Sequence, residues 1–270
     1  MSKIQLTWKN VKNSYHLLSK DKEMLLFPPL HLVTVGTGVF LLLFCMEWLS
    51  SILFPIMGDW LLVLLVYAIF FIFHFSNTFF SVAIVACVLK RIDGEDPTLI
   101  DGFSEALQRV HLILLWSLLS AFIGMLLKIM EKMRYVEFLA AFFNVAWFLL
   151  SFLAIPVLVE QKLSPFRALS ESGRLLSEKW GEACVADFSF FLIGAVFFFY
   201  YGILINILHA LVFGGDVPAV LFWTGAIGIW SINVTAYSAF RAVLYRYAKD
   251  GIVVDSFEKD DLHLAVKSSV

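Results

Sequence analysis

The chain has 270 residues, of which 60% are apolar and 16% are charged, and its formal net charge is −2. Soluble domains contain about 45–50% apolar and about 25% charged residues, so this composition excludes a soluble globular protein. Acidic residues accompany the basic ones in the polar segments after residue 20, and the net charge is slightly negative, which gives no support to a nucleic-acid partner.

The first polar segment predicts a helix that lies on the membrane surface, over about residues 5–20. Its apolar residues share one face of a helix, at positions i, i+3, i+7 and i+10: Trp8, Val11, Tyr15 and Leu18. Lysines occupy much of the remaining surface of this helix, as is typical of an interfacial amphipathic helix. The first membrane span follows it.

The longest uncharged stretch of the chain is residues 60–89, which contain no Asp, Glu, Lys or Arg. A helix rises about 1.5 Å per residue and needs about 20 residues to cross a bilayer core. These thirty residues therefore predict a tilted or protruding transmembrane helix, and the chain is expected to be a membrane protein.

Two later polar segments repeat the spacing of the first. Asp96–Pro97 and Ser164–Pro165 each place a capping residue before a proline, which is typical of the start of a helix. The chain therefore reads as three units, each an interfacial helix followed by a transmembrane hairpin. A genuine three-fold repeat and a coincidence of three polar segments near a membrane are both open interpretations.

The predicted fold class is all-α: a polytopic membrane protein, residues 1–270, with six transmembrane helices and three interfacial amphipathic helices on the cytoplasmic side. The predicted spans are residues 30–53, 60–89, 111–130, 138–159, 185–211 and 219–245, and Pro156 is expected to kink the fourth. The predicted interfacial helices are residues 5–20, 98–110 and 165–180, and residues 250–270 form a cytoplasmic tail.

The distribution of basic residues predicts the orientation of these spans. With the N-terminus inside, 17 of the 20 Lys and Arg residues fall on the inner side and three on the outer side. Short cytoplasmic segments carry an excess of Lys and Arg. Both termini are therefore expected to face the cytoplasm.

The second span carries a polar stripe on an otherwise apolar helix. Its members fall at i, i+3, i+4 and i+7 and share one face: His74, Asn77, Thr78 and Ser81. Lipid cannot satisfy such groups, so the stripe must face protein or water. Asn144 and Asn233, which are lone amides in the fourth and sixth spans, are the expected partners. The stripe is interpreted either as a structural hydrogen-bond cluster between helices or as a proton or ligand path.

The sixth span carries a continuous stripe of small residues, which we call the seam: Thr224, Gly228, Ser231, Thr235, Ser238 and Ala242. Small residues let two helix backbones approach closely, so the seam is predicted to be a packing face. A water path along the seam is the alternative.

No motif for chemistry is present in the chain. H-E-x-x-H, G-x-S-x-G and the phosphate-binding G-x-x-x-x-G-K-[ST] are all missing from the sequence. His31, His111 and His209 are dispersed among the predicted spans and form no metal-ligand pattern. We therefore expect a protein that is not an enzyme and that needs no metal or cofactor.

Three segments of the chain carry a family resemblance. Residues 8–28 read WKNVKNSYHLLSKDKEMLLFP, PVLVE at residues 156–160 leads into PFRALSESGRLL at residues 165–176 with Trp180–Gly181, and residues 240–248 read FRAVLYRYA before Gly251. They resemble an uncharacterised prokaryotic family of six-span membrane proteins and, more distantly, the membrane domain that precedes some glycerophosphodiester phosphodiesterases. The resemblance implies the six-span fold and a location in the cell (cytoplasmic or inner) membrane, and it implies no activity.

Two functions of different classes are compatible with these observations. The first is a non-enzymatic membrane scaffold or accessory subunit, which contacts membrane lipids and assembles as a homo-oligomer or with a protein partner. The second is a transporter or channel for a small or lipidic solute, with a polar path near His74. The intramembrane polar residues favour the second, whereas the absence of an acidic ion site at mid-depth and the Phe-rich second and fifth spans favour the first or a lipid cargo.

Overall fold

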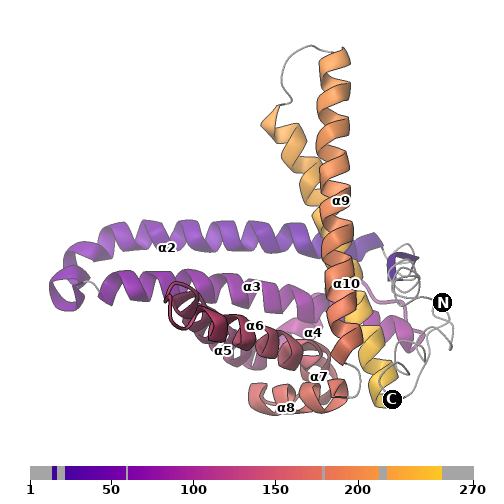
Figure 1. The fold of residues 1–270 in the computed structure, drawn as a ribbon, viewed down its shortest axis with the longest axis horizontal. Coiled ribbons are helices and arrows are strands. Elements are labelled where there is room, and N and C mark those ends of the chain that lie inside the picture. Colours follow the sequence, from indigo (N-terminus) through magenta and orange to yellow (C-terminus); the bar gives the residue numbers. More distant parts are fainter. Residues whose placement is uncertain (1–13, 17–21, 59, 178–179, 213–217, 251–270) are drawn as a thin grey trace. The chain divides into compact units, whose positions relative to one another are not determined.

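The computed structural model describes residues 14–16, 22–58, 60–177, 180–212 and 218–250, and all regular secondary structure in these ranges is helical (Figure 1). The elements are η1 (Lys22–Leu26), α2 (Phe27–Met57), α3 (Trp60–Ile92), α4 (Leu99–Gln108), α5 (Val110–Glu131), α6 (Glu137–Ser151), α7 (Ala154–Gln161), α8 (Pro165–Leu176), α9 (Trp180–Val212) and α10 (Ala219–Asp250). Apart from the helical residues 14–16, the interfacial helix predicted for residues 5–20 lies outside the described residues, and so does the tail beyond residue 250.

The chain divides into two compact units. One unit contains residues 1–29, 87–99 and 175–270, and therefore the helical pair α9 and α10. The other contains residues 30–86 and 100–174, which include most of α2 and α3 together with the helices from α4 to α8.

Five described segments are long and apolar enough to cross a membrane: Lys22–Glu47, Trp60–Ile92, Val110–Glu131, Glu137–Gln161 and Ser189–Val212. They overlap the first five predicted spans and indicate a multi-pass membrane protein. The sixth predicted span lies within α10, which is long enough but carries more polar residues along its length. The sixth span therefore stays a prediction.

Two glycines permit the turns around α3. Gly58 follows α2 with a φ of 52°, and Gly94 follows α3 with a φ of 88°. Residues that carry a side chain rarely adopt this left-handed backbone region. Glycine therefore lets each helix end there without strain. After the second turn the chain forms the short helix α4, and α8 forms later at the third predicted interfacial segment. Their position on a membrane surface stays a prediction.

The fourth apolar segment is interrupted between α6 and α7, at Phe152 and Leu153. Pro156 has no N–H to donate to the carbonyl of Phe152, four residues earlier, and its ring crowds that carbonyl. The N–H of Leu153 instead donates to the Oγ of Ser172 in α8, over 3.0 Å. Both residues are fully buried, so the side-chain acceptor from α8 satisfies a backbone donor that the interrupted helix leaves without its usual partner.

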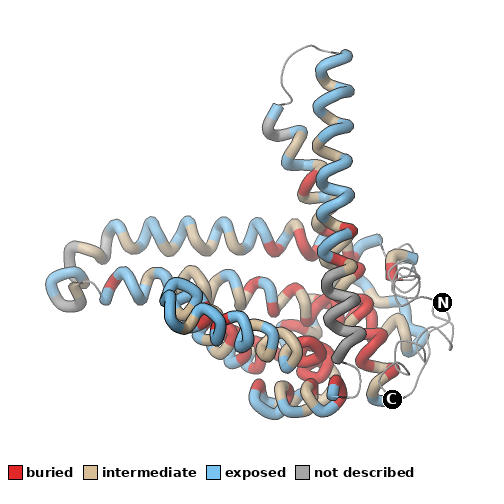
Figure 2. Tube along the Cα trace, viewed as in Figure 1, coloured by how far each residue is buried: buried red, intermediate tan, exposed pale blue. Residues whose placement is uncertain are grey.

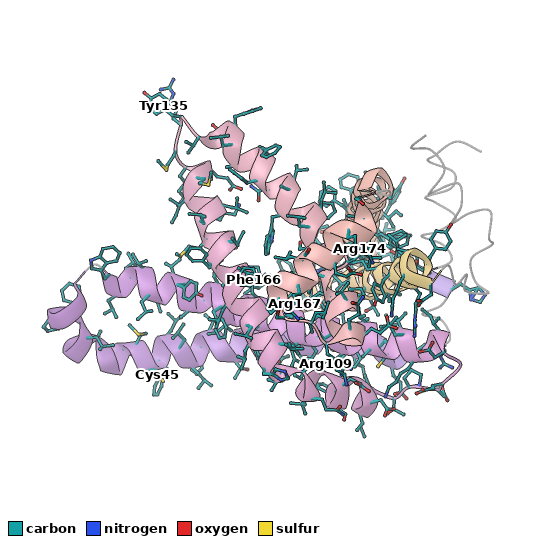
Figure 3. The ribbon with its side chains drawn as sticks, turned by 90° about the horizontal axis from the view of Figure 1, so that it is seen from below. Cys45, Arg109, Tyr135, Phe166, Arg167 and Arg174 are labelled. Atoms are coloured by element: carbon teal, nitrogen blue, oxygen red, sulfur yellow. The ribbon has the colours of Figure 1, made fainter. Side chains whose placement is uncertain are left out.

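Arg109 lies between α4 and α5 (Figure 3) and donates a hydrogen bond to the end of α7 in the same unit. Its side chain is buried, and Nε donates to the carbonyl oxygen of Val159 at 2.8 Å. Nη1 donates to the Glu105 carbonyl at 2.9 Å and also pairs with the Glu105 carboxylate. A cation at the C-terminal turn of α7 is favoured by the partial negative charge of the helix end.

The other unit is organised by the antiparallel pair α9 and α10 (Figure 1). The phenol of Tyr201 in α9 donates to the Leu221 carbonyl in α10 over 2.8 Å. At the far end of α10, Arg246 pairs with both carboxylate oxygens of Asp93 at 2.7 and 2.6 Å. The loop after α3 is thereby fixed to the last helix.

The apolar helices differ in how many of their described residues are buried (Figure 2). In the most apolar window of each span, 39% of the residues are buried in α5 and 44% in the α6–α7 segment, but only 6% in α2 and 6% in α9. An apolar helix that is uncovered on most sides is suited to lipid or to another membrane helix.

Candidate functional site

The polar stripe of α3 is not joined by hydrogen bonds. Thr78 is buried, His74 and Ser81 are half-buried, and Asn77 is exposed. Among the described residues, no side-chain hydrogen bond links these four to one another or to a neighbouring helix. The periodicity that placed them on one face therefore does not gather them into a hydrogen-bonded cluster.

The ring of His74 lies instead against α5. A Cβ added at Gly124 would be 3.2 Å from His74 Nε2 and 3.8 Å from the ring of Phe70. About two turns earlier in α3, the Tyr67 hydroxyl donates to the Leu118 carbonyl of α5 at 3.2 Å. Glycine at position 124 thus lets the imidazole pack onto the backbone of α5, and His74 contributes to a helix–helix contact.

A second histidine of the unit that contains α3 and α5, His31 in α2, lies within hydrogen-bonding distance of a neighbouring helix. Its Nδ1 lies 2.7 Å from the Oγ of Ser76 in α3, and the two residues are 4% and 1% exposed. The rings of Phe73 and Phe80 meet the imidazole edge-on, with centroids 5.7 and 6.1 Å away. This buried pair joins the first two spans in an apolar surrounding.

Sequence reasoning missed this pair. His31 was noted only as one of several dispersed histidines, and Ser76 is two residues from His74, which turns it about 200° around the helix. A second signal of the contact is Gly38, where an added Cβ would lie 2.9 Å from the side chain of Ile72. Neither Ser76 nor Gly38 could be recognised as a contact residue from the sequence without knowing that α2 packs on α3.

Asn144, one of the two expected partners of the stripe, is engaged elsewhere. Its Nδ2 donates to the Glu131 carboxylate at 3.0 Å and to the Ala140 carbonyl at 2.9 Å. Lys128 pairs with the same carboxylate at 2.7 Å. The amide therefore ties α6 to the end of α5, and the expected pairing of Asn144 with the stripe is not seen.

Asn233, the other expected partner, joins α10 to α9. Its Nδ2 donates to the Phe190 carbonyl at 3.0 Å and lies 3.3 Å from the hydroxyl of Tyr15. Burial raises the pKa of the Tyr15 phenol and the hydrogen bond from Asn233 opposes that rise, so Tyr15 stays neutral near pH 7. A Cβ added at Gly194 would be 2.9 Å from the same Nδ2, so glycine makes room for the amide.

An apolar crevice of about 450 Å³ runs beside this amide between α9 and α10, and its walls include Phe198, Ile229 and Trp230. Asn233 is the one amide side chain in its lining. The crevice is open along its length, so it resembles a lipid-facing groove more than an enclosed binding cavity.

The seam of α10 divides into two parts in the structure. Ser231, Thr235, Ser238 and Ala242 are buried, and the three hydroxyls donate to their own helix, four residues back, at 2.7–2.9 Å. Thr224 and Gly228 are exposed, and a Cβ added at Gly228 would meet nothing within 4 Å among the described residues. The second part of the seam is therefore buried and its first part is exposed, and its role as a packing face stays a prediction.

Within the described ranges, no three His, Cys, Asp or Glu side chains lie close enough to hold a metal ion. In this part of the chain some polar groups of the apolar helices join pairs of helices, and others donate to their own helix.

A family model matches residues 59–254, from the start of α3 to just beyond α10. The chain belongs to the DUF6159 family, a family of unknown function. The matched region contains His74, Asn144 and Asn233, and it leaves His31 and α2 outside. No curated protein and no solved structure matches the chain, so the comparisons assign no role to any residue of this DUF6159 member.

Ser76→Ala tests the buried pair of α2 and α3. The substitution removes the hydroxyl next to His31 Nδ1, and a buried polar atom without a partner costs about 1–3 kcal/mol. We expect a lower free energy of unfolding in detergent, measured by denaturant titration. Ser81→Ala is the matched control on the same helix and should change little; equal effects of the two substitutions would contradict the assignment.

A second pair of substitutions tests where α9 approaches α10. Gly194→Val forces a side chain against the Asn233 amide, and overpacking of this kind costs about 1–3 kcal/mol. Gly228→Val adds the same side chain where the surroundings are open, and should be nearly silent. Thermal unfolding of the purified protein compares the two, and a larger loss at Gly228 would show that the seam packs along its first part after all.

Proposed function

We propose that this protein is a non-enzymatic integral membrane protein with six spans, acting as a scaffold or accessory subunit of the cell membrane. Both termini face the cytoplasm in this proposal, and α10 provides the sixth span. Its partners are membrane lipids and a membrane protein, either a second copy or a different chain, and not nucleic acid.

The observation that carries the proposal is the use of polar groups within the apolar helices. His31 pairs with Ser76, Tyr201 reaches across to Leu221, and Asn233 reaches across to Phe190. Each contact fastens one helix to its neighbour, as expected of structural hydrogen bonds inside a membrane. The large uncovered surfaces of α2 and α9 are apolar and suit assembly rather than conduction.

Two short helices support contact with the inner leaflet. In α4, Ile100 and Leu107 are 79% and 59% exposed on one face. In α8, Phe166 is 72% exposed, and Arg167 and Arg174, the latter paired with Glu171, are exposed on the same helix (Figure 3). Exposed apolar side chains insert among lipid tails and arginines favour anionic headgroups, which is the chemistry of an interfacial helix.

The alternative is a transporter or channel for a small or lipidic solute. The apolar crevice beside Asn233 favours a lipidic cargo, because its walls are aromatic and aliphatic with one amide among them. The packing of the His74 ring on Gly124 argues against a polar path near this residue. The distant likeness to the membrane domain of glycerophosphodiester phosphodiesterases gains no support from the comparisons and adds no activity to either proposal.

The six-span topology is tested with reporters. A reporter fused after Val270 should report the cytoplasm, and one inserted between Gly214 and Gly215 should report the exterior, because 17 of 20 basic residues then lie inside. Activity of a periplasm-specific reporter at the C-terminus would place α10 outside the bilayer and reduce the topology to five spans.

His74→Gln separates scaffold from transporter. Glutamine keeps a polar side chain but cannot titrate near neutral pH. For a scaffold, liposomes holding the wild-type protein should show neither dissipation of an imposed pH gradient nor transfer of a fluorescent phospholipid between leaflets, and the variant should assemble as the wild type does. A wild-type flux that His74→Gln abolishes in a folded protein would establish the transporter instead.

A further inference from the structure

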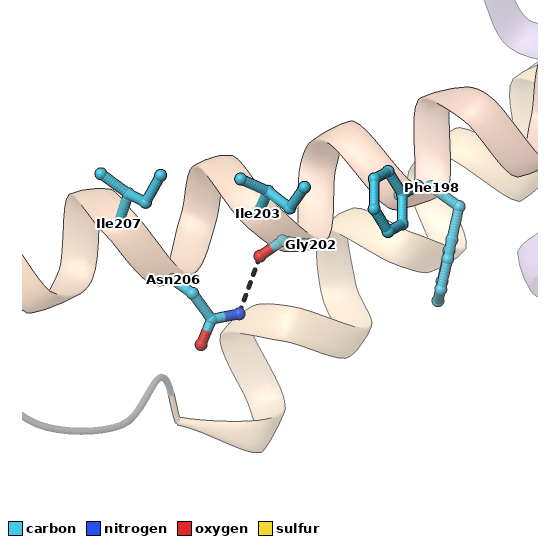
Figure 4. A pocket seen from close by; sticks show the side chains of 6 residues that line it. Phe198, Gly202, Ile203, Asn206 and Ile207 are labelled. Atoms are coloured by element: carbon cyan, nitrogen blue, oxygen red, sulfur yellow. Dashed lines mark hydrogen bonds between the residues drawn. The ribbon is translucent and has the colours of Figure 1, made fainter.

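The hydrogen bonds of polar side chains in the described helices are of two kinds. Some stay within one helix, as when Asn206 of α9 donates to the Gly202 carbonyl four residues earlier (Figure 4). Others join elements that lie far apart in the chain. The short helix α7 has a bond of the second kind at each of its ends, and its residues 154–159 are all buried.

The first end of α7 is bonded to α8. The Leu153 N–H donates to Ser172 Oγ at 3.0 Å, and both residues are fully buried. The next residue of α8 lies against the end of α6, because a Cβ added at Gly173 would be 3.0 Å from Leu150 Cδ2. Helix α8 therefore packs at the point where α6 ends and α7 begins.

The second end of α7 is bonded to the junction of α4 and α5. Arg109 Nε donates to the Val159 carbonyl at 2.8 Å, and Nη1 donates to the Glu105 carbonyl of α4 at 2.9 Å. The Arg109 N–H donates to the Ala106 carbonyl at 3.1 Å, and the Arg109 carbonyl accepts from the Ile113 N–H at 2.9 Å. Arg109 is therefore attached to both α4 and α5 at the point from which its guanidinium reaches α7.

Both bonds to α7 lie in the interior of one compact unit. A buried group that loses its partner keeps its desolvation penalty, so separating α4 or α8 from α7 strands a backbone group of α7. The two bonded positions, Leu153 and Val159, are six residues apart, about 9 Å along a helix axis. Close-packed interiors have low compressibility and transmit strain. One short buried segment thus carries the contacts of both outer helices.

We propose that α7 couples α4 to α8, so that loosening either helix from α7 also loosens the other. Such a coupling is reciprocal, because each helix changes the stability of the other by the same factor. The sequence predicts both helices to lie on the membrane surface, so α7 is a device by which an event at one surface helix reaches the other through the interior. The inference goes beyond the proposed function and holds for a scaffold and for a transporter alike.

Hydrogen exchange of the full-length protein in lipid nanodiscs tests the coupling, because amide exchange in a helix reports how often that helix opens. Ser172→Ala removes the acceptor of the Leu153 N–H, and should accelerate exchange about 5-fold or more in α4 as well as in α8. Arg109→Lys keeps the positive charge and loses the fork of donors, and should accelerate exchange in α8 as well as in α4.

Ser117→Ala is the matched control in the same unit, because this buried hydroxyl donates to the Ile113 carbonyl of its own helix. It should leave exchange in α4 and α8 as in the wild type. Exchange in α9 is the reference for global unfolding and should be unchanged in all three variants. Acceleration confined to α8 in Ser172→Ala and to α4 in Arg109→Lys would overturn the coupling. An equal acceleration in every helix, α9 included, would also overturn it, because the effect would then be a general loss of stability.

Discussion

Hydrocarbon offers no hydrogen bonds, and this constraint determines where every polar group of the apolar helices can lie. Most backbone groups are satisfied within their own helix, and hydroxyls such as those of Ser117 and Thr235 donate to carbonyls four residues earlier. Groups that cannot be satisfied in this way must reach a neighbouring helix. The buried contact of His31 with Ser76 and the bond from Asn233 to Phe190 therefore specify which helices pair, while the apolar side chains around them supply contact area.

Five apolar helices of membrane-spanning length were predictable, because length and lack of charge can both be read directly from the sequence. The stretch predicted at residues 60–89 is α3, Trp60–Ile92, and the helix extends only until its glycine turn. Sequence also places the bend of the fourth span near Pro156, but the interruption falls at Phe152 and Leu153, because a proline acts on the carbonyl four residues earlier. Because α10 carries more polar residues than the other long helices, the topology measurement has to decide whether it spans the membrane.

The candidate site was less accessible to sequence reasoning, because helical periodicity gives the face of a residue but not its neighbour. His74 shares a face of α3 with Thr78, but its ring packs on Gly124 of α5. No pattern within α3 could indicate that neighbour. Asn233 reaches Tyr15, 218 residues away in the chain. Gly228 and Gly194 are both glycines in apolar helices, and only the packing of α9 on α10 distinguishes the open position from the crowded one.

The interruption between α6 and α7 also has a mechanical meaning. The N–H of Leu153 is held by a side chain of α8 rather than by its own helix, so the direction of α7 relative to α6 depends on where Ser172 lies. A lateral displacement of α8 would break a buried hydrogen bond unless α7 swung with it. One buried hydrogen bond thus links the position of α8 to the bend between α6 and α7 in the fourth apolar segment.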